Sequence, residues 1–369
     1  MQAEVGEEQT KRRALILTAV TGLTAGCSAY RLKRRQCHVL AILTLTFPFF
    51  ALVACGYLAA RFGLLALSAI PGLNGFVLFF ALPCMLYRFG ASAPLAELFN
   101  PGVALTYLFS GLLVLALCLA ITRRGAMGWN DAAFGALVAA FPNTGFMGVP
   151  LLVALLGPAA APPVIVSLLV DMLLVSSLCI ALSRLGPQGV GDGVSENAVS
   201  AGVAARNALK GVAANPLPWA ILTGALVTWL QLPLPKPVIA TMGLLADAAS
   251  PVALFTIGAV LARSHILALS DSAHVVPWQT TLPVALLKLF VHPLVVYGVG
   301  TAAIAFGLHL EPFTLKVLVL LAALPSASNV VLLAERYQAD SGRIARIILI
   351  STASAFFTFS GAVALMGGR

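Results

Sequence analysis

Long apolar runs separated by short polar connections dominate this sequence of 369 residues. A helix needs roughly 20 mainly apolar residues to cross the hydrocarbon core of a bilayer. Ten runs are of about this length, at 38–60, 68–87, 101–121, 131–156, 162–183, 215–231, 238–262, 279–306, 313–334 and 343–366. They are continuous rather than alternating, which favours membrane helices over the strands of a β-barrel. The sequence therefore predicts an all-α polytopic membrane protein with ten transmembrane helices.

The composition agrees with this architecture and excludes other classes of protein. Hydrophobic residues make up 60% of the chain and charged residues 9%, whereas soluble domains carry about 25% charged residues. The net charge of +9 would suggest nucleic acid in a soluble protein, but basic residues of a membrane protein flank its cytoplasmic helix ends. We therefore expect the protein to contact membrane lipids and not to bind nucleic acid. No HExxH, GxSxG or Walker A motif is present, so we expect no enzyme, cofactor or metal site.

The runs divide into two sets of five with matching interruptions. The fourth run of the first set is broken by Phe141-Pro142-Asn143-Thr144-Gly145, and that of the second by Leu324-Pro325-Ser326-Ala327-Ser328-Asn329. The second run of each set carries one central proline, Pro83 or Pro251. Because five is an odd number, the second set enters the membrane from the opposite face. Such matching breaks are typical of transporters built from inverted repeats, so we predict two inverted five-helix repeats with broken crossover helices 4 and 9.

This organisation divides the chain into an N-terminal tail over 1–37, a first repeat over 38–183, a linker over 184–214 and a second repeat over 215–366. Without the tail, the Lys and Arg residues favour the side of the linker. The positive-inside rule then places the linker in the cytoplasm and both termini outside. The tail has a basic start, a short apolar stretch and Thr24-Ala25-Gly26-Cys27, so it is either signal-like and removed or a disordered extension.

The two breaks also carry the polar groups that a solute site needs. A proline inside a helix removes a donor and displaces a carbonyl group, and at membrane depth such groups require protein partners or a wet cavity. Asn143 and Asn329 each offer two donors and an acceptor, and half-helix N-termini carry a positive partial charge that suits a carboxylate. We therefore predict that a small organic anion binds at the breaks. The predicted binding residues there are Pro142, Asn143, Thr144, Gly145, Pro325, Ser326, Ser328 and Asn329.

Three ionisable residues, Asp171, Asp247 and Lys288, lie inside apolar runs and are candidates for function. Lys288 lies one helical turn before His292, on the same face. It could neutralise a substrate carboxylate, pair with Asp171 or Asp247, or reach an interface, and we include it among the binding residues. Asp171, Asp247 and His292 are candidates for ion coupling, with a structural role as the alternative. Arg343 is expected in a charged cytoplasmic connection.

The sequence resembles the auxin efflux carrier family, which includes plant auxin exporters and bacterial permeases for malate and malonate. The stretch from Asn143 to Leu151, NTGFMGVPL, is similar to the fourth-helix motif of that family. Further similar stretches, such as Leu287-Lys288-Leu289 with Pro293, extend the resemblance over about 38–366. It implies ten helices in two inverted repeats, a scaffold domain, a transport domain with the substrate site at the crossing, and a homodimer.

These observations predict a secondary transporter, a permease or efflux carrier, that moves a small organic anion such as a carboxylate across the inner (plasma) membrane by alternating access. Two alternatives stay open. One is a sodium-coupled organic anion symporter of bile-acid type, although the breaks contain Asn, Thr and Ser rather than the carboxylates expected for a cation. The other is a membrane sensor that binds its ligand without transporting it.

Overall fold

The computed structural model describes residues 43–44, 46–92, 100–123, 127–185, 216–270 and 277–366. Within this part of the chain the regular structure is helical, apart from one isolated backbone bridge between Pro142 and Ser326. The predicted tail over 1–37, with its signal-like segment, and nearly all of the predicted linker lie outside the described residues.

Six helical stretches are long and apolar enough to cross a membrane: Leu67–Ser92, Pro101–Arg123, Pro158–Ser183, Lys236–Arg263, Trp278–Ala305 and Ser341–Met366. Shorter apolar helices occupy Thr46–Arg61, Thr144–Leu156, Trp219–Trp229 and Pro312–Ala322. The protein is thus a helical, multi-pass membrane protein. The ten spans and the inverted repeats remain predictions.

The elements of the first half follow the helix Thr46–Arg61. They are η1 (Leu67–Ala69), α2 (Ile70–Phe76), η2 (Val77–Ala81), α3 (Leu82–Ser92), α5 (Pro101–Arg123), α6 (Trp129–Ala140), η3 (Thr144–Gly148), α7 (Val149–Leu156), η4 (Pro158–Ala160), α8 (Ala161–Val170), η5 (Asp171–Val175) and α9 (Ser176–Ser183). Those of the second half are α11 (Pro216–Trp229), α12 (Lys236–Ser270), α13 (Trp278–Leu286), η6 (Leu287–Val291), α14 (His292–Ala305), α15 (Pro312–Ala322), α16 (Val330–Arg336) and α17 (Ser341–Met366).

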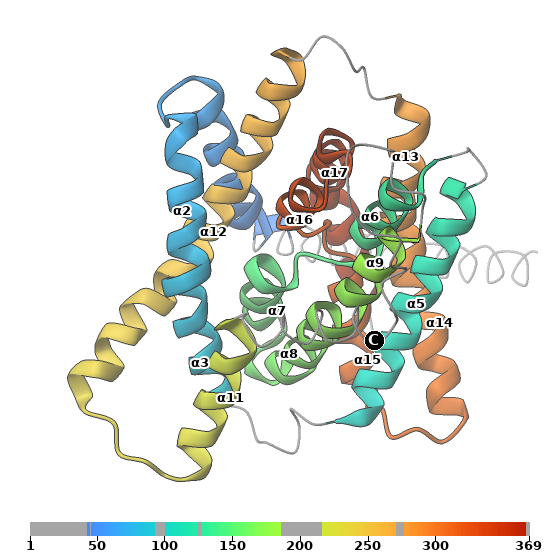
Figure 1. The fold of residues 1–369 in the computed structure, drawn as a ribbon. Helices are drawn as coiled ribbons and strands as arrows, with labels where there is room; N and C mark the ends of the chain where they lie inside the picture. The colour runs from blue at the N-terminus through green and yellow to red at the C-terminus, as the bar shows by residue number, and fades with distance from the viewer. Residues whose placement is uncertain are drawn as a thin grey trace, which may run out of the picture.

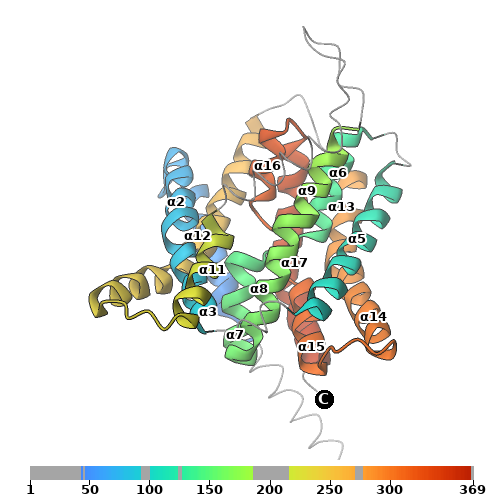
Figure 2. The same cartoon turned by 60° about the horizontal axis from the view of Figure 1, so that its bottom comes forward.

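The helices form two groups, which Figures 1 and 2 display side by side. The scaffold group consists of Thr46–Arg61, α2, α3, α11 and α12, and its blue and yellow helices lie at the left of both views. The crossing group consists of α5 to α9 and α13 to α17. Each group therefore contains helices from both halves of the sequence. Within each group, helices that are far apart in the sequence pack together.

Four glycines bring the helices of the scaffold group into backbone contact. At each of them an added Cβ would overlap with a carbonyl oxygen of the facing helix. Small residues allow this kind of close approach between membrane helices. The contacts are Gly56 with Phe255, Gly258 with Val53, Gly90 with Ile221 and Gly224 with Tyr87.

Two short helices lie at the centre of the crossing group. The side chains from Ala132 to Ala140 in α6 and from Val317 to Ala322 in α15 are buried on every face. A helix that is apolar all round is stable only when protein or lipid covers all of it. Here protein covers it, and α6 and α15 end at Ala140 and Ala322, immediately before the two predicted breaks.

Candidate functional site

The two broken helices cross each other at their breaks. The backbone N–H of Asn143 donates to the Pro325 carbonyl oxygen at 2.8 Å, and the N–H of Ala327 donates to the Phe141 carbonyl oxygen at 3.0 Å. These two bonds form the antiparallel bridge between Pro142 and Ser326. Backbone groups freed at each proline are thus satisfied by the other break, which is what buried irregular backbone at membrane depth requires.

The first break then returns directly to helix. The carbonyl oxygen of Asn143 accepts hydrogen bonds from the N–H groups of Met147 at 3.1 Å and Gly148 at 2.9 Å. The Thr144 hydroxyl turns back to the Pro142 carbonyl oxygen at 3.3 Å. The helical stretch Thr144–Leu156 therefore begins at the crossing, and its first N–H groups point there.

The predicted polar residues of both breaks lie close to the crossing and are mostly withdrawn from the surface. Asn143, Thr144, Ser326 and Ser328 are buried, and Asn329 is half-buried. Ser326 Oγ and Asn329 Oδ1 have no hydrogen-bond partner among the described residues. Buried polar atoms in proteins are nearly always hydrogen-bonded, so the second break offers free hydrogen-bonding groups to a solute or to water.

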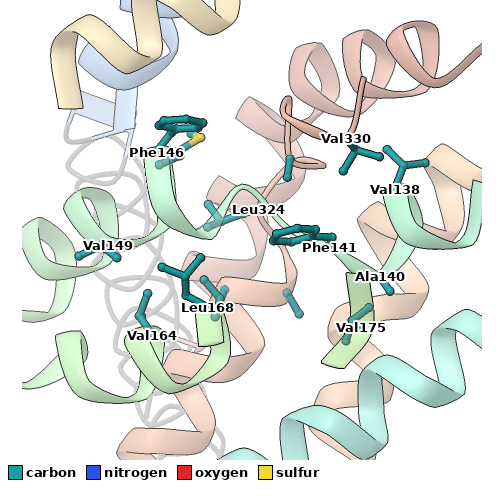
Figure 3. Close-up of a cluster of buried hydrophobic side chains, with 14 of the residues drawn as sticks. Val138, Ala140, Phe141, Phe146, Val149, Val164, Leu168, Val175, Leu324 and Val330 are labelled. Carbon is teal, nitrogen blue, oxygen red and sulfur yellow. The ribbon is translucent and has the colours of Figure 1, made fainter. Parts of the chain in front are cut away.

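Apolar side chains enclose the crossing on its other sides. Figure 3 shows Phe141 and Leu324, the first residues of the two breaks, among a cluster that includes Val138, Leu168 and Val330. Gly145 itself is not tightly packed, whereas a Cβ at Gly148 would come within 2.9 Å of Leu321 Cδ1 and 3.1 Å of Leu324 Cδ1. Gly148 thus admits the side chains of the other broken helix.

Lys288 belongs to η6, and the end of its side chain lies beside this crossing. Its Nζ donates to the carbonyl oxygen of Ala322, the last residue of α15, at 3.1 Å and lies 2.9 Å from Nδ1 of His292. Both side chains are fully buried. The C-terminal carbonyl groups of a helix carry negative partial charge, so α15 attracts the ammonium group to the start of the second break.

Asp171 approaches the crossing from η5 and is also fully buried. The Tyr107 hydroxyl, from α5, donates to Asp171 Oδ2 at 3.1 Å, whereas Oδ1 has no hydrogen-bond partner among the described residues. The carboxyl group also interacts electrostatically with Lys288 and lies beside the Thr144 hydroxyl. Of the two carboxylates that Lys288 could pair with, the fold places Asp171 within electrostatic range of it, although the contacts of Nζ are with His292 and Ala322.

Both charged residues lie in π-helical turns. Asp171 is the first residue of η5, and Lys288 is the second of η6. A π turn replaces the regular hydrogen bonds of an α-helix by bonds between residues five apart, and such turns are frequent at functional sites. Just after η5, the hydroxyl of Ser176, the first residue of α9, donates to the Asp171 carbonyl oxygen at 2.8 Å and so supports the distorted turn.

Asp247 does not join this cluster. Its Oδ1 lies 2.6 Å from Arg88 Nη1, and the two side chains are 69% and 48% exposed. The pair joins α12 to α3 within the scaffold group. The possible Lys288–Asp247 pairing is therefore wrong, because the fold places these residues in different helix groups.

Sequence reasoning missed two hydroxyl groups of the site. Tyr107 holds Asp171, and Ser351 Oγ, from α17, accepts a 3.3 Å hydrogen bond from the Ser326 backbone N–H. Each lies in an apolar run that contains several hydroxyl residues, so no signal in the sequence singled it out.

The expectation for Arg343 is corrected by the structure. Its side chain is 2% exposed, with Nη1 donating to the Asp131 carbonyl oxygen at 3.0 Å and Nε and Nη2 donating to that of Thr280 at 3.2 and 3.1 Å. Arg343 thus joins the first turns of α6 and α13 to α17 instead of lying in a solvated connection. The burial of Arg343 could not be predicted from the sequence, because it depends on carbonyl groups that two distant helices supply.

Metal-binding side chains do not gather in the described part of the chain, where no three His, Cys, Asp or Glu residues group together. The site instead combines amides, hydroxyls and one ammonium group, which are hydrogen-bond donors for an anion.

Comparison with known proteins places this arrangement in a family. A family model described as "Membrane transport protein" matches residues 41–363. A relative from Rhizobium meliloti (strain 1021), named "Putative malonate transporter", is 29% identical over 329 residues, covering 88% of this chain and 96% of the relative. The "Uncharacterized transporter YfdV" of Escherichia coli (strain K12) is 26% identical over 295 residues, covering 79% of this chain and 86% of the relative. The protein thus belongs to this family of membrane transport proteins, the auxin efflux carrier family.

Proposed function

We propose that the protein is a secondary transporter of a small organic anion, and that the anion is a carboxylate bound at the crossing. The observation that carries the proposal is the position of Lys288, a buried ammonium group held at the end of α15 where the second break begins. A buried cation at membrane depth is costly and marks a substrate or ion pathway. The name of the Rhizobium relative, which refers to malonate, agrees with a carboxylate.

The binding groups that we assign to the anion lie around this ammonium group. Asn143 and Thr144 would contribute from the first break, and Ser326, Ser328 and Asn329 from the second. The unpartnered Ser326 Oγ and Asn329 Oδ1 support this assignment, because buried polar atoms without a protein partner are matched by a ligand or water. Pro142, Gly145 and Pro325 would shape the backbone rather than bind through polar side chains.

Two inverted repeats, over 38–183 and 215–366, are part of the proposal. They are supported by the glycine contacts of the scaffold group, which occur in corresponding pairs. In each pair, both residues of one contact are separated from their counterparts in the other contact by the same number of positions along the sequence. Gly56 and Phe255 correspond to Gly224 and Tyr87, and Gly90 and Ile221 correspond to Gly258 and Val53.

Other features repeat with the same separation. Pro83 of α3 corresponds to Pro251 of α12, and Gly63, with φ of 75°, corresponds to Gln231, with φ of 53°. Thr46–Arg61 and α11 thus pair as first helices, and α2–α3 and α12 as second helices. We infer ten spans, of which the fourth and the ninth are the two broken helices.

Alternating access follows from the two helix groups. The crossing group holds both breaks and would move against the scaffold group, exposing the crossing to each side in turn. Where the groups touch, a Cβ at Gly145 would lie 3.9 Å from Leu82 Cδ2 of α3, an ordinary apolar contact, and the hydroxyl oxygens of Thr46 and Ser360 lie 3.4 Å apart. We further propose the inner membrane as the location, a cytoplasmic linker and a homodimer.

Counterflow in liposomes tests the function. Purified protein in vesicles loaded with unlabelled malonate should accumulate radiolabelled malonate in the absence of sodium. Asn143→Ala and Asn329→Ala should reduce the rate at least about tenfold, the loss expected when a buried hydrogen bond to a charged group is removed. Gln279→Ala, which removes an exposed amide of α13, is the control.

Three results would contradict the proposal. Unchanged counterflow in both asparagine variants would remove the crossing as the site. Uptake that requires sodium would support a sodium-coupled symporter. Malonate binding without any counterflow would support a sensor.

A further inference from the structure

A continuous chain of buried side chains connects the carboxylate of Asp171 with the ammonium group of Lys288. The Tyr107 hydroxyl donates to Asp171, the Tyr107 and His292 rings lie with their centroids 6.4 Å apart, and His292 Nδ1 lies 2.9 Å from Lys288 Nζ. All four side chains are at most 1% exposed. The chain contains one negative and one positive group, so its charges balance when no anion is bound.

Binding of an anion would disturb this balance. If a substrate carboxylate takes Lys288 as its counter-ion, Asp171 is left as a buried charge without compensation. A buried charge without a compensating charge is strongly unfavourable, and a buried carboxyl group then takes up a proton instead of staying charged.

We propose that Asp171 couples transport to protons by this exchange, and the inference rests on the proposed function. The substrate carboxylate binds to the Lys288 ammonium group, and the Asp171 carboxylate takes one proton from the aqueous phase on the same side. Release on the other side reverses both events: the proton leaves Asp171, and Lys288 again has Asp171 as its counter-ion. One proton thus moves with each anion, in the same direction.

The geometry of Asp171 suits a proton better than a metal cation. Oδ1 has no hydrogen-bond partner among the described residues, whereas Oδ2 already accepts from Tyr107. A proton on Oδ1 therefore leaves the Tyr107 bond in place. A cation would need several oxygen ligands and would lie beside the Lys288 ammonium group.

Few other ionisable groups surround Asp171. Tyr107 faces it from α5 and Lys288 from η6, with His292 of α14 behind Lys288. The adjoining η3 contributes the Thr144 hydroxyl, α8 contains no ionisable side chain, and Cys179 of α9 lies beside Cys118 of α5. Asp171 is thus the carboxyl group available for the exchange within this cluster.

Liposome transport tests the proposal. With the membrane potential held at zero, a gradient of one pH unit, acidic outside, should drive about tenfold accumulation of malonate by wild-type protein if one proton moves with each anion. Asp171→Asn resembles the protonated residue, so it should retain malonate counterflow and lose the accumulation driven by the gradient. Glu311→Gln neutralises an exposed carboxylate before α15 and should retain both.

Two transport results would overturn the proposal. One is accumulation by Asp171→Asn equal to that of the wild type, as expected if the malonate itself carries the proton. The other is malonate accumulation by the wild-type protein that does not depend on the pH gradient.

A second measurement needs no substrate and therefore separates this proposal from the proposed function. In Lys288→Met the counter-ion is absent, so infrared spectroscopy near neutral pH should detect a protonated carboxylic acid that disappears in Lys288→Met/Asp171→Asn. Absence of that band would overturn the exchange even if malonate is transported. If the band is present and malonate shows no counterflow, the substrate assignment fails while the charge exchange is supported.

Discussion

Gly56 lies directly against the carbonyl oxygen of Phe255, leaving no space for a Cβ between Thr46–Arg61 and α12. Gly224 has the same relationship to Tyr87, between α11 and α3. The scaffold group therefore relies on backbone contact within two helix pairs, each of which joins a helix of the first proposed repeat to a helix of the second.

Substitution of these glycines should destabilise the scaffold group to a similar extent. Gly56→Ala and Gly224→Ala each force two helices apart, and we expect a cost of roughly 1–3 kcal/mol, as for an overpacked core. Thermal unfolding of the purified protein in detergent measures the effect. Gly243→Ala is the matched control in α12, where an added Cβ meets open space. Equal melting temperatures for all three variants would contradict the close contacts.

Loss of the Arg343 guanidinium should destabilise the crossing group. Arg343→Met leaves the carbonyl groups of Asp131 and Thr280 without this donor, and an unsatisfied buried group costs about 1–3 kcal/mol. Unfolding in a graded series of denaturing detergent would measure the loss. Arg336→Met, at an exposed position in the last turn of α16, should have little effect. An equally stable Arg343→Met protein would mean that the guanidinium does not join the three helices.

The ion pair between Arg88 and Asp247 gives a further prediction. Because both side chains are largely exposed, we expect Arg88→Gln and Asp247→Asn to have similar small effects on stability, about 1 kcal/mol or less. Exchange of the two charges, in Arg88→Asp/Asp247→Arg, should restore stability.

Malonate uptake under a pH gradient, measured beside thermal unfolding, tests the coupling role predicted for Asp247. A loss of uptake in Asp247→Asn that exceeds the loss in Arg88→Gln would support that role.

Several features of the fold were accessible from the sequence because they depend on local chemistry. Long apolar runs specify helices that suit a bilayer, and a proline within such a run interrupts its backbone ladder. The breaks at Pro142 and Pro325 were predicted on this basis, and α6 and α15 end just before them. The contact of Lys288 with His292 was likewise predictable, since residues four apart share one helix face.

The other contacts of the site depended on the tertiary structure. Neither the π turns at Asp171 and Lys288 nor the hydroxyl groups of Tyr107 and Ser351 leave a pattern in the sequence, because their roles depend on partners from distant helices. Packing also determined the environment of each ionisable residue. Asp171 lies in the buried cluster, Asp247 forms an exposed ion pair, and Arg343 lies among backbone carbonyl groups. The sequence by itself determined which segments are apolar and where they break. The crossing of those segments determined which buried charges meet, because the cost of burying a charge is set by the groups that surround it.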